Sequence, residues 1–270
     1  MEYQPERRAN WETVEKIVKQ WRQWAIDTNT TKMIVGISGG KDSTVAATLA
    51  VDVFGANNVW GIMMPNGVQS DIDDAIAVVD LLGINSMTVN IEPAVKAISN
   101  SIITQMHKES FNGKVDTLSE QTKINLPARV RMTTLYAIGQ TLGAKVICTD
   151  NASESYIGYS TMFGDNAGAY APLKGLYATE VMELARYLCI PRELSHKTPS
   201  DGLCGKTDED NLGFTYYDLD SYLFDKEKGM KYLPLETIIK IEQMHERNRF
   251  KTEVLDIPGP IFKESTTIPF

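Results

Sequence analysis

Cysteine, histidine and long apolar runs are scarce in this chain of 270 residues. The three cysteines, Cys148, Cys189 and Cys204, are odd in number and widely spaced, which argues against a disulfide framework or a zinc knuckle. The histidines form no HExxH pattern, so a histidine-ligated metal site is not expected. No run of about 18 apolar residues occurs, and the N-terminal segment lacks the apolar stretch of a signal peptide. We therefore expect a cytoplasmic protein with no membrane segment.

Positive charge is also in deficit. The 27 Lys and Arg residues are outnumbered by 35 Asp and Glu residues, which gives a formal net charge of −8. Because affinity for nucleic acids depends on clustered Lys and Arg, this balance argues against a nucleic-acid-binding protein. It stays compatible with one local site for a small phosphate ligand. The hydrophobic fraction of 43% is sufficient for a large core.

Short apolar runs alternate with segments of helical periodicity along the chain. Strands are expected at 33–37, 59–64, 87–91 and 145–148. Helices are expected from Asn10, a predicted N-cap, to residue 24, and at 42–54, 71–82, 93–110, 122–142 and 177–188, with Pro127 near the start of its helix. This order predicts an α/β fold, an open, mostly parallel twisted sheet with helices on both faces. No repeat or boundary divides residues 1–270, so we expect a single domain, with a breaker-rich active-site loop at 195–213.

The most informative segment is GISGGKDS at residues 36–43, between an expected strand and an expected helix. Its two adjacent glycines allow close approach of a ligand, and the helix that follows presents unpaired N–H groups to an anion. Ser38 and Ser43 add hydroxyl donors. Asp42 would repel a phosphate, but it is suited to hold an Mg²⁺ ion that bridges to that phosphate. The segment therefore predicts a phosphate-binding loop; the alternative is a glycine turn that only joins strand to helix.

This segment resembles the pyrophosphate-binding loop of the N-type ATP pyrophosphatases, which cleave ATP to AMP and pyrophosphate. Other motifs resemble the ammonia-dependent NAD synthetases, and the resemblance covers about residues 10–260. The matching segments are MPNGVQ at 64–69, NLPARVRM at 125–132, TDNASE at 149–154, GYST at 158–161 with Gly164 and Asp165, KTPS at 197–200, and KTDE at 206–209 with Leu212 and Gly213.

The resemblance implies an adenine nucleotide alpha hydrolase-like, three-layer fold and a ligase that amidates deamido-NAD with ammonia, using ATP as co-substrate and Mg²⁺ as cofactor. The implied ATP-binding residues are Gly36, Ile37, Ser38, Gly39, Gly40, Lys41, Asp42, Ser43, Met64, Thr149 and Ser200. Those implied for the substrate are Arg129, Asp165 and Lys251; those for catalysis are Asp42, Lys197 and Ser200; those for the metal are Asp42 and Glu154. The family forms homodimers, for which the Trp-bearing N-terminal helix and the 122–142 helix offer apolar area. The length leaves no room for a glutaminase domain beside the synthetase unit, so ammonia is the expected nitrogen donor.

Several of these residues have simpler alternatives. Lys41 is interpreted as solvent-facing or as an auxiliary phosphate contact, and Arg131 as part of an exposed helix face. Glu154 has the alternative of a solvated loop acid, whereas Cys148 is expected in the core.

The chain also departs from the family pattern. Met162 replaces a basic residue, Ala169 replaces an acid and Phe250 replaces a frequent histidine. Three hypotheses follow: a divergent NAD synthetase, which we favour, a paralogue that amidates a different carboxylate, and a catalytically silent adenine-nucleotide-binding module.

Overall fold

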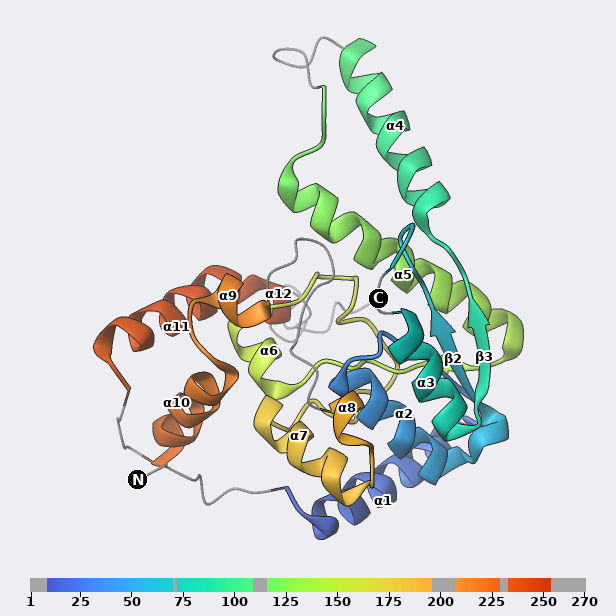
Figure 1. The fold of residues 1–270 in the computed structure, drawn as a ribbon, viewed down its shortest axis with the longest axis vertical. Helices are drawn as coiled ribbons and strands as arrows, with labels where there is room; N and C mark the ends of the chain where they lie inside the picture. Colours follow the sequence, from blue (N-terminus) through green and yellow to red (C-terminus); the bar gives the residue numbers. More distant parts are fainter. Residues whose placement is uncertain (1–8, 70–71, 109–115, 196–206, 229–232, 254–270) are drawn as a thin grey trace, which may run out of the picture.

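Four short parallel strands form the central sheet, in the order β3-β2-β1-β4 (Figure 1). The computed structural model describes residues 9–69, 72–108, 116–195, 207–228 and 233–253. The strands are β1 (Met33–Gly36), β2 (Val59–Met63), β3 (Asn85–Thr88) and β4 (Lys145–Val146). β1 pairs with β2 on one side and β4 on the other, so the segments that follow these three strands leave from one edge of the sheet.

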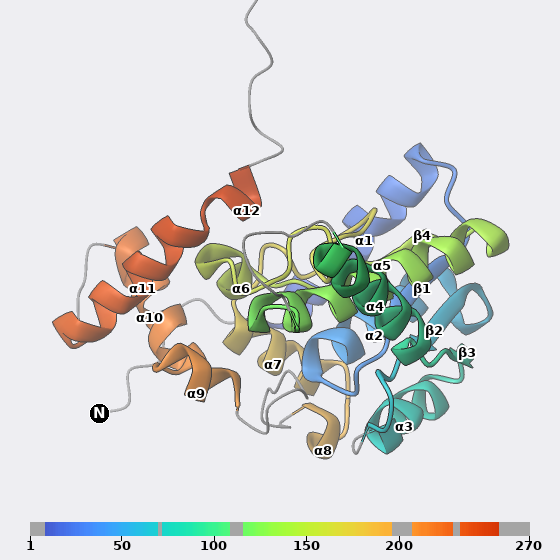
Figure 2. The same cartoon turned by 90° about the horizontal axis from the view of Figure 1, so that it is seen from above.

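Helices cover both faces of this sheet because the side chains of β1 alternate between two hydrophobic clusters. Met33 and Val35 face one cluster, and Ile34 faces the other. The helices that contribute to the first are α1 (Trp11–Asp27), α2 (Lys41–Phe54), α3 (Ile72–Leu82), α7 (Ala178–Tyr187) and α8 (Arg192–Ser195). Those on the other face are α4 (Glu92–Lys108) and α5 (Glu120–Leu142), and a short 3-10 turn η1 (Ala56–Asn58) precedes β2. Figure 2 shows the same elements from above.

A third hydrophobic cluster lies beside the sheet and joins the remaining helices (Figures 1 and 2). It is formed around α6 (Ala152–Ile157), α9 (Asp208–Leu212), α10 (Tyr216–Lys228) and α11 (Leu235–Asn248), which α12 (Phe250–Glu253) follows. Helix α7 contributes to two clusters: Val181 and Leu184 pack in the first, and Ala178 packs in the third. This helix therefore connects the sheet to the group of helices that carries α6.

Most of the expected elements are present, including α1 with Asn10 as its N-cap. Three predictions were inaccurate. β3 begins and ends earlier than the apolar run at 87–91, β4 has only two residues, and Pro127 lies inside α5 beyond its first turn. Helices α6 and α8 to α12 were not predicted, and α9 lies within the 195–213 segment that was expected to be a loop. Within the described residues, none of the helices is both long and apolar enough to span a membrane.

Candidate functional site

The GISGGKDS segment forms the predicted turn between β1 and α2. Gly36 ends β1, and the buried Ile37 donates its N–H to Ile62 O at 2.9 Å. Gly39 has a φ of +78°, and a Cβ there would lie 2.8 Å from the Asp74 Cβ, so both conformation and space require glycine. Gly40 is the N-cap of α2, whose first N–H groups have no partner within the helix.

The two serines of this turn stabilise its shape. The Ser43 hydroxyl donates to Gly40 O at 3.1 Å, and the Ser38 and Ser43 hydroxyl oxygens are 3.1 Å apart. Gly40 N–H donates to Ser38 Oγ at 3.2 Å. The hydroxyl groups that the sequence offered as donors to a ligand thus also hydrogen-bond within the loop.

Lys41 is buried, and the prediction that it faces solvent is wrong. Its side chain is 5% exposed, and its Nζ lies 2.6 Å from Asp42 Oδ2. The same Nζ is 5.4 Å from the centre of the Tyr216 ring. Burial lowers the pKa of Lys41, but Asp42 and Glu154 outweigh that effect and hold it above its ordinary value. The lysine is therefore an internal counter-ion to acidic side chains from two helices.

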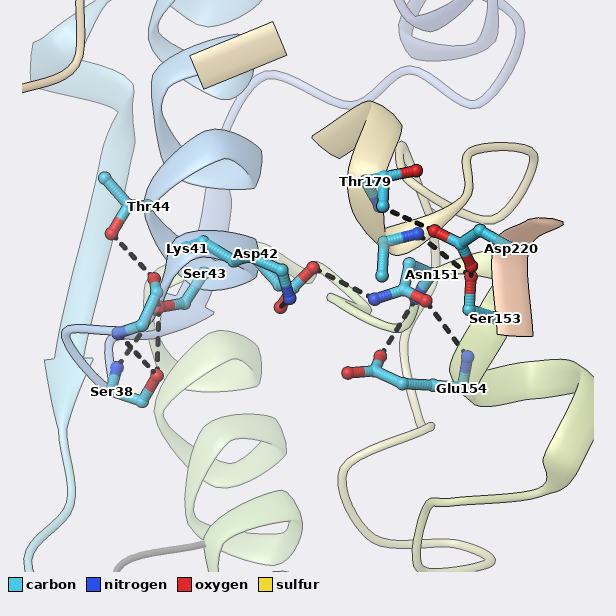
Figure 3. A network of polar contacts seen from close by, with 12 residues as sticks. Ser38, Lys41, Asp42, Ser43, Thr44, Asn151, Ser153, Glu154, Thr179 and Asp220 are labelled. Carbon is cyan, nitrogen blue, oxygen red and sulfur yellow. Dashed lines mark hydrogen bonds and ion pairs between the residues drawn. The ribbon is translucent and has the colours of Figure 1, made fainter. Parts of the chain in front are cut away.

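Asn151 joins these two acidic side chains (Figure 3). Its amide Nδ2 donates to Asp42 Oδ1 at 3.1 Å, and its Oδ1 accepts from the Glu154 N–H at 3.0 Å. Glu154 Oε2 in turn accepts from the Asn151 N–H at 3.2 Å, which completes a capping box at the start of α6. Sequence reasoning assigned no role to Asn151, although a residue of this type before a helix with Glu three positions later is a capping signal.

Glu154 belongs to the first turn of α6 and is partly buried, so it is not the solvated loop acid of the alternative interpretation. Burial raises the pKa of Glu154 well above its ordinary value; Asp42 adds to this rise and Lys41 opposes it. Two neighbouring carboxylates suit Mg²⁺, which proteins commonly hold through one or two carboxylates together with substrate phosphates. No group of three or more His, Cys, Asp or Glu side chains that could hold a metal occurs in the described part of the chain. The donor set therefore fits a cation shared with a phosphate.

The residues predicted to contact substrate form a network around the 158–165 segment. Lys251 Nζ donates to Gly158 O at 2.7 Å and Ser160 O at 2.9 Å, and Arg129 Nε donates to Met162 O at 3.2 Å. Asp165 Oδ1 accepts from the Thr161 N–H at 2.6 Å. These side chains thus hold the backbone of the segment that carries Met162.

Arg131 is partly buried and hydrogen-bonded to the backbone, so the prediction of an exposed helix face is wrong. Its Nε donates to Met64 O at 3.0 Å, and burial lowers its pKa from the ordinary value. Cys148 is buried as expected, and burial, followed by the nearby Asp150, raises its pKa to about 12. Arg131 therefore fixes the end of β2, and Cys148 belongs to the core.

Thr149, Asp150 and Tyr216 are three further described residues of the site. Thr149 is partly buried after β4, and burial together with Asp165 raises the pKa of the adjacent Asp150 to about 7. The buried Tyr216 hydroxyl has no hydrogen-bond partner in the described residues, and no local sequence signal marks it. Lys197 and Ser200 lie outside the residues that the structure describes.

Comparison with known protein families identifies the family of this chain. Residues 13–255 match the model of the NAD synthase family. The chain belongs to the NAD synthase family. The NH(3)-dependent NAD(+) synthetase of Pyrococcus furiosus is 38% identical, over 81% of this chain and 79% of the relative. That of Pyrococcus horikoshii is 34% identical, over 93% of this chain and 96% of the relative.

Among solved structures, this NAD synthase family member is similar to the NMN synthetase of Francisella tularensis. The TM-score is 0.76 at 34% sequence identity, and the match covers 93% of this chain and 96% of that one. The α/β fold class with a parallel sheet is thereby confirmed.

Proposed function

We propose that this chain is a ligase that converts deamido-NAD to NAD with ammonia and ATP, releasing AMP and pyrophosphate. The proposal rests on one observation in a chain of the NAD synthase family. Asp42, which follows the glycine turn, and Glu154 are both hydrogen-bonded to Asn151. The relatives named NH(3)-dependent NAD(+) synthetase support ammonia as nitrogen donor and an enzyme over a catalytically silent module.

The reaction consists of two substitutions. An oxygen of the nicotinate carboxylate forms a bond to the α-phosphorus of ATP, and the bond from that phosphorus to the pyrophosphate oxygen breaks. Ammonia then forms the C–N bond and loses a proton, and AMP leaves with the former carboxylate oxygen. In this proposal, the backbone N–H groups after Gly39 hold the phosphates, with Lys41 as the adjacent positive charge.

Asp42 and Glu154 are the residues that would hold Mg²⁺. When bound, the ion neutralises negative charge that develops on the departing pyrophosphate. ATP contacts by the loop residues, Met64 and Thr149, and catalytic roles for Lys197 and Ser200, stay predictions of the family resemblance. For Met64, the backbone carbonyl already accepts from Arg131, so its contribution would come from the side chain or the N–H.

For the substrate side, we infer that Arg129, Asp165 and Lys251 act mainly through the 158–165 segment. Each is hydrogen-bonded to the backbone of that segment, which would form one wall of the dinucleotide site. Met162 in this segment, and Ala169 beyond it, carry no charge. Replacing Met162 with Lys should therefore tighten deamido-NAD binding, and an unchanged dissociation constant would contradict this assignment.

The test is a product assay on the purified protein with Mg-ATP, ammonium chloride and deamido-NAD. AMP, pyrophosphate and NAD should form in equal amounts, and Asp42→Asn should form none while keeping the wild-type circular dichroism spectrum. Absence of both AMP and NAD with the wild-type protein would show that the proposal is wrong.

A second acceptor is favoured by one observation, the similarity to an NMN synthetase over nearly the whole of both chains. Nicotinate mononucleotide carries the same carboxylate as deamido-NAD but lacks the adenylate half, so it needs fewer charged contacts. The two acceptors should be compared at equal concentration in the same assay. A larger kcat/KM for the mononucleotide would establish the paralogue, and a larger value for deamido-NAD would exclude it.

We also infer a homodimer, through the face formed by α4, β3 and α5. Ile98, Ile102, Met87 and Ile124 are 37 to 44% exposed there, and α4 buries none of its residues. The N-terminal helix α1 is less suitable than the sequence suggested, because Trp21 is fully buried within the chain. Light scattering should give the mass of a dimer, and Ile98→Glu with Ile102→Glu should give a monomer. A monomeric wild-type protein would overturn this inference.

The single domain and the cytoplasmic location stay predictions.

A further inference from the structure

We propose that Asn151 is a positioning residue that sets the orientation of Asp42 and Glu154 for a divalent cation. The inference rests on the proposed function, in which these two carboxylates hold the metal. Asn151 is fully buried and lies where the start of α6 meets the start of α2 (Figure 3). It carries no charge itself, so its role is to direct the charged groups on either side.

The contacts of Asn151 leave few degrees of freedom to the two acids. Asp42 Oδ1 accepts from the Asn151 amide at 3.1 Å, and Asp42 Oδ2 lies 2.6 Å from Lys41 Nζ. Each oxygen of Asp42 therefore has a fixed donor. Glu154 Oε2 accepts from the Asn151 N–H at 3.2 Å, which holds that carboxylate at the same residue. One side chain and its own backbone thus restrain both acids.

Helix α6 does not depend on the Asn151 amide for its position. The Ser153 hydroxyl donates to the buried Asp220 carboxylate and accepts from the Ala178 N–H at 2.9 Å. Further along α6, the Tyr156 hydroxyl donates to Glu242 Oε1 at 2.7 Å. These bonds tie α6 to α7, α10 and α11 (Figure 1). Loss of the Asn151 amide should therefore affect the orientation of Asp42 and leave the helix in place.

The chemistry of the side chain explains why an amide suits this position. The amide can donate to Asp42 and accept from the Glu154 N–H at the same time. A serine at the N-cap position retains the acceptor for the helix but is too short to reach Asp42. Serine and glycine substitutions therefore separate the capping role from the positioning role.

The experiment measures Mn²⁺ binding, by electron paramagnetic resonance, to the full-length protein with a non-hydrolysable ATP analogue. Asn151→Ser and Asn151→Gly should weaken Mn²⁺ binding about tenfold or more, the usual effect of removing a group that orients a metal ligand. The Mg²⁺ concentration for half-maximal pyrophosphate release should rise by a similar factor, with kcat largely recovered at saturating Mg²⁺. A purely structural role would lower kcat without moving the Mg²⁺ dependence.

Tyr156→Phe is the matched control, since it removes a hydrogen bond between α6 and α11 that involves neither Asp42 nor Glu154. It should lower the melting temperature and leave Mn²⁺ affinity unchanged. Mn²⁺ affinities of both Asn151 variants within twofold of the wild type would overturn the proposal. A wild type that binds Mn²⁺ but forms no product would refute the proposed function, while the Mn²⁺ comparison would still decide the role of Asn151. A wild type that binds no Mn²⁺ would refute both.

Discussion

Replacement of Lys41 by Met tests the buried counter-ion directly. The side chain is 5% exposed and its ammonium group is 2.6 Å from Asp42, so methionine retains the packing and removes the charge. Removing one partner of a buried ion pair costs about 3 to 5 kcal/mol. We expect the lower end, about 3 kcal/mol, because Asp42 is 20% exposed and keeps its hydrogen bond from Asn151. The corresponding fall in melting temperature is about 6 to 12 °C.

The matched control is Lys240→Met. Lys240 forms a 3.1 Å pair with Glu236 on α11, where the two side chains are 47% and 81% exposed. An exposed pair of this kind contributes less than about 1 kcal/mol. Urea unfolding of both variants at about neutral pH gives the free energy of unfolding of each. Equal losses in the two variants would refute the assignment of Lys41 as a buried counter-ion.

A double variant isolates the interaction between the two charges. Asp42→Asn alone leaves the Lys41 ammonium without its closest partner, whereas Lys41→Met with Asp42→Asn removes both charges. The double variant should therefore recover more than half of the stability lost in Lys41→Met. Simple addition of the two single losses would show that Lys41 and Asp42 do not interact energetically.

Three further predictions concern the folding of the chain. Gly39→Ala should cost about 2 kcal/mol in urea unfolding, since φ is +78° and the new Cβ would lie 2.8 Å from its nearest neighbour; a loss below about 0.5 kcal/mol would contradict it. Burial raises the pKa of Glu242, but hydrogen bonds, first that of Tyr222, outweigh it and lower the pKa from 4.5 to about 2. The stability that Glu242→Gln removes is therefore present above pH 4.5 and should shrink as the pH falls toward 2, so an equal difference at about pH 6 and pH 3 would contradict it. Trp21→Ala, at a fully buried position, should cost about 3 to 5 kcal/mol, whereas Trp11→Ala, at a side chain 52% exposed, should cost less than about 0.5 kcal/mol in the same assay.

The turn between β1 and α2 could be predicted because its signals are local. A buried apolar run, two glycines and a helix follow one another within about twenty residues. The strand predicted at 87–91 was placed too late in the sequence, because the apolar residues Val89 and Ile91 lie beyond the end of β3. Their backbone N–H groups still donate to Met63 O and Pro65 O, each at 2.9 Å. The alternation therefore marks the side chains that face the interior, Val89 and Ile91, and not the bounds of the strand.

The burial of Lys41 could not be predicted, because it depends on residues more than a hundred positions away. Glu154 and Tyr216 approach it only after α6 and α10 pack against each other. Helix α10 itself did carry a signal, since Leu219, Tyr222 and Leu223 have the spacing of one helix face and are all buried.

The site lies where two hydrophobic clusters meet, and this position explains its polar composition. Asp42 enters from α2, which packs in the first cluster, and Glu154 enters from α6, which packs in the third. Each cluster fixes its own helix, but apolar packing alone cannot orient a carboxylate across the boundary between them. Directional hydrogen bonds can do so, and the Asn151 amide supplies one at this boundary. The net charge of −8 fits the same reasoning, because the acids gathered here need cations to bind a phosphate-rich ligand, and the chain itself places Lys41 among them.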